Sequence, residues 1–334
     1  MTFDSLTPEQ QIDRLTVAAR QSLQRFGLPE LSLQPVSTYN NTVFKVNGAG
    51  GAAYTLRLHR PGHKRIEWIR SEMIWLLAIR QQTPLRVPYP VTSLQGDLVL
   101  DVAVEGHDQL YHAVLFRWFD GEFYTPETIP LTAVHAAGTL LANLHQFASA
   151  YHPPASFVRP RLDWEGLFGE ESPYNPGEGV RIFTDEQKSV FSAVDSRVKS
   201  VMEHLGESPD TFGLIHADFL TKNYLFDADG VAVIDFDDCG FGYYLYDLAP
   251  GLLQFKFTAR YDALREALLA GYSSVRSLSA ADISALEAFI AARHLASCRW
   301  QAGHLHYPHI RERAAATIAA RTEDLKRYLL TGIL

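Results

Sequence analysis

Cysteine is scarce in this sequence, and positive charge is not in excess. Two cysteines, Cys239 and Cys298, stand among 334 residues, which excludes a disulfide-stabilised framework and a cysteine-rich zinc site. Lys and Arg number 30 against 38 Asp and Glu, so the formal net charge is −8. Because a nucleic-acid partner requires basic groups that neutralise its phosphates, we expect no nucleic-acid binding.

Long apolar runs are absent as well. The longest candidate, residues 133–144, includes His135 and Asn143 and is shorter than the about 20 residues of a membrane-spanning helix. Residues 1–9 are acidic and lack the apolar core of a signal peptide. Hydrophobic residues make up 47% and charged residues 20%, as in ordinary soluble globular proteins. We therefore expect a cytoplasmic protein without a membrane partner, and the sequence leaves its oligomeric state open.

The first 120 residues have the pattern of a helix followed by strands. Thr7, Pro8 and Gln10 form a helix start, which predicts a helix over about 7–26. Two β-like segments, 42–46 and 53–59, flank the glycine-rich turn 47–51, a strong hairpin signal. Further expected elements are a helix over 65–82 and strands over 98–104 and 112–119.

After Gly121 the pattern becomes mostly helical. Helices are expected over 131–147, 184–205, 261–272, 280–305 and 310–330. Short β segments are expected over 213–216, 224–226 and 231–235. The sequence thus predicts an α+β protein with a strand-rich lobe, residues 1–120, and a larger, mainly helical lobe, residues 121–334.

One group of polar residues stands out within that β island. A hairpin turn over 227–230 would return Asp235 to the neighbourhood of Asn223. Carboxylate and amide oxygens suit Mg²⁺ rather than zinc. Asp218, on the loop before the hairpin, could accept a proton from a bound hydroxyl. Any one of these residues could simply cap a turn or end a strand, but the set has the components of a phosphoryl-transfer site.

The amino-acid sequence of this region resembles that of a known family. The order His216, Asp218 and Asn223, followed by Asp235, resembles the catalytic and metal-binding loops of the protein-kinase-like fold. Segments 215–218 and 234–249 look most like the aminoglycoside phosphotransferase family. Relatives of that family include choline kinase, type II homoserine kinase and the stress-response kinases. The resemblance runs from Asn40 to about Trp300. It implies a bilobal protein-kinase-like fold, with a small antiparallel sheet in the N-terminal nucleotide-binding lobe and a C-terminal catalytic lobe.

The resemblance also implies roles for individual residues. Asp218 matches the catalytic base, and Asn223 and Asp235 match the Mg²⁺ ligands. Arg57 occupies the position of the basic residue that holds the ATP phosphates, and Glu72 matches its helix partner.

Three further positions follow from the same resemblance. Phe116 and Trp118 lie in a segment, 115–121, that resembles the hinge whose backbone reads the adenine. Asp247 matches an acidic residue that supports the catalytic loop structurally.

The sequence departs from the family pattern at three places. Arg57 stands where a Lys is usual, and the two cations bind phosphate differently because only Arg has a planar fork. A glycine-rich cover loop is missing, since residues 37–42 contain no glycine. Ala217 and Leu220 stand where the antibiotic kinases commonly carry Gly and His. Arg57 has an alternative interpretation as a surface strand residue, with Lys45 as the next candidate for the phosphates.

We expect an ATP- and Mg²⁺-dependent kinase of a small-molecule hydroxyl. Alternatives are a Ser/Thr protein kinase of the stress-response type and a catalytically silent nucleotide-binding module. A phosphatase with Asp235 as nucleophile is a further rival, although it requires alternating strands and helices after Asp237. A dinucleotide fingerprint at 48–53 is rejected because a strand, not a helix, follows it.

The acceptor is expected to bind near the acidic residues that follow the metal ligand. Asp237 and Asp238, with a rim of glutamates at 165, 170, 171 and 178, would favour a cationic acceptor. Such acceptors include an amino alcohol, a homoserine-like metabolite or an aminoglycoside-like sugar. The alternatives are that these carboxylates form a solvated surface, or that Asp237 is a further metal ligand.

Overall fold

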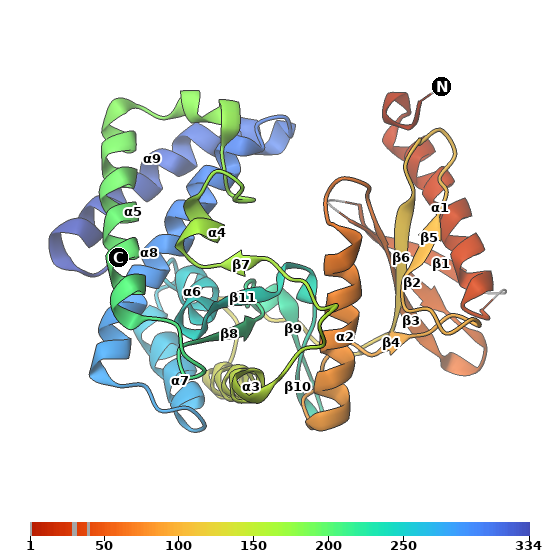
Figure 1. Ribbon diagram of the computed structural model, residues 1–334, viewed down its shortest axis with the longest axis horizontal. Helices are drawn as coiled ribbons and strands as arrows, with labels where there is room; N and C mark the ends of the chain where they lie inside the picture. The colour runs from red at the N-terminus through yellow and green to blue at the C-terminus, as the bar shows by residue number, and fades with distance from the viewer. Residues whose placement is uncertain (1, 29–31, 39–40) are drawn as a thin grey trace. The chain divides into compact units, whose positions relative to one another are not determined.

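The computed structural model describes residues 2–28, 32–38 and 41–334. Its contacts divide the chain into two compact units (Figure 1). The first unit comprises Met1–Gly121 with two later segments, Pro153–Arg159 and Ala232–Asp237. The second comprises Glu122–His152, Pro160–Val231 and Asp238–Leu334.

The first unit is an antiparallel sheet with two helices. The strands run in the order β1-β2-β3-β6-β4, with β5 also paired to β6. Their bounds are β1 Ser32–Thr38, β2 Asn41–Asn47, β3 Ala53–His59, β4 Pro90–Val91, β5 Leu100–Val102 and β6 Tyr111–Arg117. The helices are α1 Pro8–Arg25 and α2 Ile66–Gln82. Side chains of α1 pack on the sheet, where Leu15 and Leu23 join a core that contains Phe44, Leu56 and Leu115.

The helix cap and the hairpin that the sequence predicts in the first unit are both present. The Thr7 hydroxyl accepts from the Gln10 N–H, and the Gln10 side chain accepts from the Thr7 N–H, which completes a capping box. The segment between β2 and β3 closes as a hairpin, with the Gly48 N–H donating to the Ala52 carbonyl at 2.6 Å. This hairpin confirms the rejection of the dinucleotide fingerprint.

The second unit is mainly helical. Its helices are α3 Leu131–Ala150, α4 Trp164–Phe168, α5 Asp185–Leu205, α6 Tyr244–Phe255, α7 Tyr261–Ser273, α8 Ala280–Gly303 and α9 Pro308–Thr331. Helix α8 packs against α5, α6 and α9, and α3 packs against α7 (Figure 1). The crossing of α3 and α7 depends on glycine: a Cβ on Gly138 would lie 2.2 Å from the Leu268 carbonyl oxygen.

Two small sheets lie among these helices. Strands β7 Arg161–Leu162, β11 Gly240–Tyr243 and β8 Phe212–Ile215 form one sheet in that order. Strands β9 Tyr224–Asp227 and β10 Gly230–Val233 form the predicted hairpin. The predicted fold class is confirmed, with an antiparallel sheet in the N-terminal part and a mostly helical remainder. Among the described residues, no helix is both long enough and apolar enough to cross a bilayer.

Candidate active site

The loop between β8 and β9 holds the predicted base. Asp218 is 8% exposed. Its Oδ1 accepts from the Arg293 guanidinium at 2.7 Å, and its Oδ2 lies 3.0 Å from the Lys222 ammonium and 3.1 Å from the Asn223 amide nitrogen. Burial alone would raise the pKa of this carboxyl, yet Arg293 and Lys222 hold the pKa below its ordinary value. Asp218 is therefore an ionised carboxylate at neutral pH.

Asn223 presents its amide in a defined direction. The nitrogen Nδ2 donates to the Asp218 carbonyl at 2.8 Å and to Asp218 Oδ2. The side-chain oxygen Oδ1 has no hydrogen-bond partner within the described part of the chain. An amide oxygen left open beside a carboxylate is a hard ligand, so this residue fits the predicted role toward a divalent cation.

A buried carboxylate fixes the backbone of this loop. Asp247 of α6 accepts from the His216 N–H at 2.7 Å and from the Ala217 N–H at 2.6 Å. It also accepts from His145 Nε2 at 3.0 Å. Ala217 has φ +71°, a left-handed conformation that costs an L-residue of order 1–3 kcal/mol. Asp247 thus holds a strained peptide directly before the base, in keeping with the supporting role implied by the resemblance.

The imidazole behind Asp247 is neutral. His145 is fully buried, and burial lowers its pKa although Asp247 opposes the shift. With Nε2–H donated to the carboxylate, Nδ1 is free to accept from the Tyr272 hydroxyl at 2.9 Å. The loop that carries Asp218 is therefore connected through Asp247 and His145 to α3 and α7.

The first unit contains the predicted phosphate-binding pair. The Arg57 guanidinium of β3 donates to Glu72 Oε2 of α2 at 2.5 Å, and Arg57 Nε donates to His59 Nε2 at 3.1 Å. Arg57 is 5% exposed and Glu72 is 1% exposed. The alternative that Arg57 is a surface strand residue is therefore wrong. Its role toward a nucleotide stays a prediction.

Asp235 follows β10 in the same unit. Its φ of +65° makes it, with Ala217, one of two non-glycine residues with positive φ in the described ranges. Its side chain is 49% exposed, and Oδ1 lies 3.6 Å from an Arg57 guanidinium nitrogen. Left-handed backbone at an exposed carboxylate is typical of a functional position. Half of the Asp235 side chain is thus accessible to solvent, and its role as a metal ligand stays a prediction.

Asp237 has a different environment from Asp235. Its Oδ2 lies 3.7 Å from the Lys64 ammonium and accepts from Asn41 Nδ2 at 3.3 Å. Burial would raise its pKa, but Lys64 and Arg57 hold the pKa well below the ordinary value. His59, Glu72 and Asp237 offer ligand atoms within 4.8 Å of one another. The Glu72 and Asp237 carboxylates already face Arg57 and Lys64, so their charge is offset by side chains of this chain and needs no metal ion.

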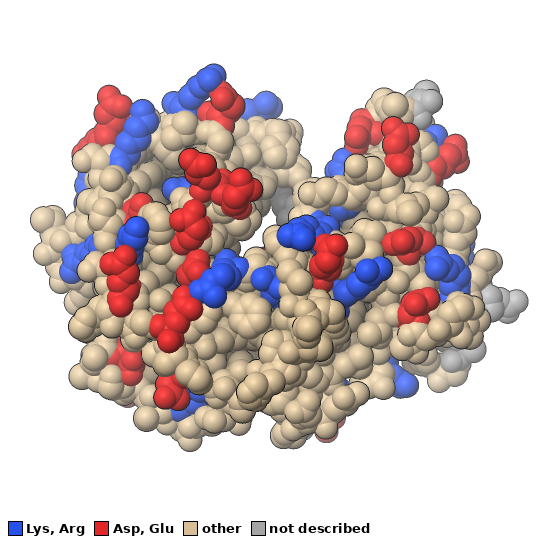
Figure 2. Space-filling model, in the orientation of Figure 1, with Lys and Arg blue, Asp and Glu red and all other residues tan. Residues whose placement is uncertain are grey.

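Asp238, in the second unit, interacts electrostatically with Tyr174. The rim glutamates, Glu165, Glu170, Glu171 and Glu178, are all exposed. Figure 2 shows acidic side chains in a row on the visible face of the second unit, interspersed with basic ones. The roles of Asp237 and Asp238 in binding the acceptor stay predictions.

The predicted hinge begins at the end of β6. Phe116 is buried, with its ring centroid 5.2 Å from the Arg57 guanidinium carbon. Trp118 donates its indole N–H to Asp120 at 3.0 Å, and the Lys45 ammonium lies 4.2 Å from the Trp118 ring centroid. Lys45 therefore sits over an aromatic face. Adenine binding at this segment stays a prediction. Of the missing cover loop, Tyr39 and Asn40 lie outside the described residues.

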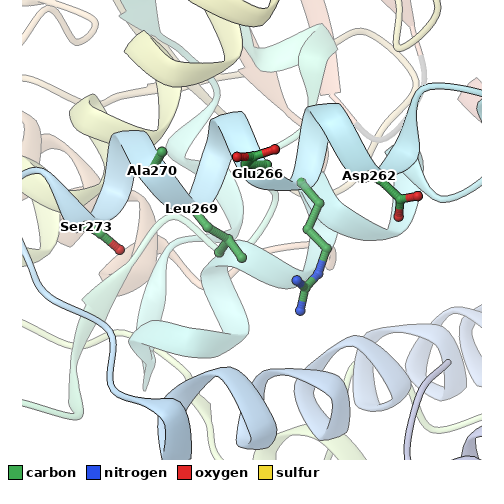
Figure 3. Close-up of a pocket in the computed structure, with 6 residues that line it drawn as sticks. Asp262, Glu266, Leu269, Ala270 and Ser273 are labelled. Carbon is green, nitrogen blue, oxygen red and sulfur yellow. The ribbon is translucent and has the colours of Figure 1, made fainter.

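A hollow of about 390 Å³ lies along α7 in the second unit (Figure 3). Its lining includes Asp262, Arg265, Glu266 and Leu269. None of the predicted site residues lines this hollow.

Sequence reasoning missed both cations that contact Asp218. Lys222 directly precedes Asn223, where its ammonium reaches back to the base. Arg293 lies in a stretch of α8, from Phe289 to Ala296, that is otherwise buried and, apart from His294, apolar. A lone arginine in such a stretch signals a buried partner, although the sequence does not name that partner.

Comparisons with known proteins identify the family of this chain. The model of the phosphotransferase enzyme family matches residues 32–289. The chain belongs to that family. A phosphatase mechanism through Asp235 is accordingly not supported, and the chain after β11 is helical rather than an alternation of strands and helices.

Individual relatives share less than a third of their residues with this chain. An amicoumacin kinase of Bacillus subtilis is 22% identical over 231 residues, which make up 69% of this chain. The chain spans 65% of that relative's length. The structure of a microcompartment-associated aminopropanol kinase is 29% identical, with a TM-score of 0.84 over 95% of this chain and 98% of that one.

A further solved structure shares the fold. It is an amicoumacin kinase in complex with AMP-PNP, Ca²⁺ and the ligand Ami, 18% identical. Its TM-score is 0.75, and the match covers 93% of this chain and 96% of that one.

Proposed function

We propose that this protein is an ATP-dependent kinase that transfers a phosphoryl group to a hydroxyl of a small amino alcohol. The observation that carries the proposal is the ionised Asp218 carboxylate on a loop held in strained geometry by Asp247. The same loop places the open oxygen of Asn223 beside it. Family membership supports the reaction class.

On the acceptor side, Asp218 is the group that would receive the hydroxyl. An ionised carboxylate has about four acceptor positions on its two oxygens. Oδ2 has two partners, Lys222 and Asn223, whereas Oδ1 has only Arg293 among the described residues. The remaining position on Oδ1 would accept the hydroxyl hydrogen. Because Asp218 is a weak base with this environment, its main contribution is to orient the attacking oxygen and to take its proton as the new bond forms.

On the donor side, Arg57 and Glu72 would position the ATP phosphates. Glu72 holds the guanidinium on one edge, and Arg57 also faces Asp235. Asn223 and Asp235 are the residues that would hold Mg²⁺ or another divalent cation. When bound, such a cation supplies positive charge that neutralises the phosphate oxygens. Phe116 and Trp118 belong to the segment that would read the adenine. A kinase structure of this fold in complex with AMP-PNP and Ca²⁺ supports the use of a nucleotide and a divalent cation.

The acceptor class follows from charge and from one comparison. Asp238 and Asp218 both interact electrostatically with Tyr174. The structure that matches at 29% identity is named an aminopropanol kinase. We infer that the Asp238 carboxylate attracts the ammonium of an amino alcohol whose hydroxyl binds at Asp218.

The test measures ATP consumption with paired acceptors. Purified protein is supplied with ATP and Mg²⁺ and with one of two acceptors. The first is aminopropanol, and the second is the uncharged propanediol, in which a hydroxyl replaces the amino group. We expect turnover with the amino alcohol, a lower rate with the diol, and none with Asp218→Asn. The KM for the amino alcohol should rise with ionic strength, and Asp238→Asn should raise that KM more than it lowers kcat.

Two results would contradict parts of this proposal. Equal rates with both acceptors, or a KM for the amino alcohol that does not change with ionic strength, would contradict the amino-alcohol assignment. The assignment of kinase activity would stand. No phosphoryl transfer to any hydroxyl metabolite or protein, together with intact ATP binding, would identify a catalytically silent module.

A further inference from the structure

Arg293 is a partly buried cation that donates to a carboxylate and to a phenol hydroxyl, and it also interacts with Tyr246. It lies on α8 between the fully buried Ala292 and His294, and its side chain is 18% exposed. Removing a guanidinium from water is costly unless its donors are satisfied, so such a residue persists only with well-placed acceptors. Its terminal nitrogens donate to Asp218 Oδ1 at 2.7 Å and to the Tyr174 hydroxyl at 3.2 Å.

These contacts connect three separate parts of the second unit. Asp218 lies on the catalytic loop, Arg293 on α8, and Tyr174 in the irregular segment between α4 and α5. Arg299, on the same helix, donates to the carbonyl oxygens of Tyr174 at 3.3 Å and Phe168 at 2.9 Å. Two arginines of α8 therefore hold this segment, but only Arg293 reaches the base.

The bond to Oδ1 determines which way the carboxylate faces. Oδ2 is directed by Lys222 and Asn223, which lie on the same loop and move with it. Arg293 is the partner that comes from outside the loop, and it contacts the oxygen that retains an open acceptor position. Lys222 is 63% exposed and competes with water for its bond, whereas Arg293 is shielded.

We propose that Arg293 is a positioning residue that fixes the Asp218 carboxylate for the acceptor hydroxyl and joins it to the Tyr174 segment. The proposal rests on the proposed function, because it presumes that Asp218 receives the hydroxyl. The planar fork of arginine serves both partners at once, which the point charge of a lysine does not do.

The experiment compares Arg293→Met, Arg293→Lys and the matched control Arg299→Met. Phosphoryl transfer and ATP affinity are measured separately, the latter by calorimetry with Mg²⁺·ATP. Misplacement of a reacting group by about 1 Å lowers kcat by about 10²-fold, which we expect for Arg293→Met. Its ATP affinity should remain that of the wild type, because the side chains that Arg293 binds, Asp218 and Tyr174, both belong to the acceptor side of the proposed reaction. Arg293→Lys should recover part of kcat, and Arg299→Met should keep nearly all of it.

A double substitution separates positioning from general support of the fold. In an Asp218→Asn background, Arg293→Met should lower the residual rate little further, because the group it positions is already gone. If Arg293→Met does not fold, Tyr174→Phe tests the same connection. That variant removes the hydroxyl partner of Arg293, and it should lower kcat with unchanged ATP affinity.

The outcomes distinguish this inference from the proposed function. Full activity of Asp218→Asn would overturn the function and, with it, the role of Arg293. An inactive Asp218→Asn together with wild-type kcat in Arg293→Met would overturn the role of Arg293 alone. Equal losses in Arg293→Met and Arg299→Met would also overturn it, since they would indicate that α8 only holds the segment in place.

Discussion

Replacement of Asp247 should destabilise the protein more than any other single carboxylate change discussed above. The side chain is fully buried and accepts from two backbone N–H groups and one imidazole N–H. Asp247→Ala removes every acceptor and leaves three buried donors unsatisfied, each at about 1–3 kcal/mol. The sum, about 3–9 kcal/mol, is a large share of the 5–15 kcal/mol typical of a whole domain.

Asp247→Asn should destabilise the protein less than Asp247→Ala. The amide keeps one acceptor oxygen, which can still serve one side of the former carboxylate. Its NH₂ group then faces a donor, so at least one bond is lost, at about 1–3 kcal/mol. The expected order of destabilisation is Asp247→Ala, then Asp247→Asn, then the exposed Asp262→Asn control, which should stay within about 0.5 kcal/mol of wild type.

The assay is urea unfolding followed by circular dichroism, with phosphoryl transfer measured below the transition. Asp247→Asn should also lower kcat, because the left-handed peptide at Ala217 loses its restraint. A destabilisation below about 1 kcal/mol for Asp247→Ala, the lower limit for even one unsatisfied buried donor, would refute this reasoning.

Three further expectations concern other residues. Asp235→Ala should weaken Mg²⁺-dependent ATP binding by at least about tenfold, since loss of even an outer-shell partner costs that much; unchanged affinity by calorimetry would count against the ligand role. Arg57→Lys should weaken ATP binding and Arg57→Ala should weaken it further, whereas equal affinities in all three proteins would place the phosphates elsewhere. The lowered pKa of His145 means that the unfolded chain binds more protons below about pH 6.5, so the free energy of unfolding should fall as pH drops below that value. His145→Gln should show a smaller fall between pH 7.5 and 5.5, by urea unfolding at each pH, and an unchanged fall would exclude His145 as a contributor.

Local sequence signals predicted much of the fold. The cap at Thr7, the hairpin between β2 and β3 and the turn at 227–230 each depend on neighbouring residues, and all three are present. The sequence did not predict helix α6, in which every residue except Gln254 is buried, so the helix lacks the solvent-exposed polar face by which a surface helix is identified. It also contains Pro250, which ordinarily argues against a helix interior.

The active site was predictable as a set of residue types but not as an arrangement. The spacing of Asp218, Asn223 and Asp235 indicated phosphoryl transfer. The pair between Asp218 and Arg293 joins residues 75 positions apart, and no local pattern encodes such a contact. The left-handed backbone of Ala217 could not be predicted either, because alanine has no preference for that conformation and Asp247 stabilises it from helix α6.

The central claim is that Asp218 receives the acceptor hydroxyl in a phosphoryl transfer. Its most direct test is the rate of phosphoryl transfer by Asp218→Asn, measured beside its affinity for Mg²⁺·ATP. The account predicts that transfer falls by about 10²–10⁴-fold, the usual contribution of a positioned proton acceptor, while the affinity for the nucleotide is nearly unchanged. Transfer within a few-fold of the wild-type rate would contradict it.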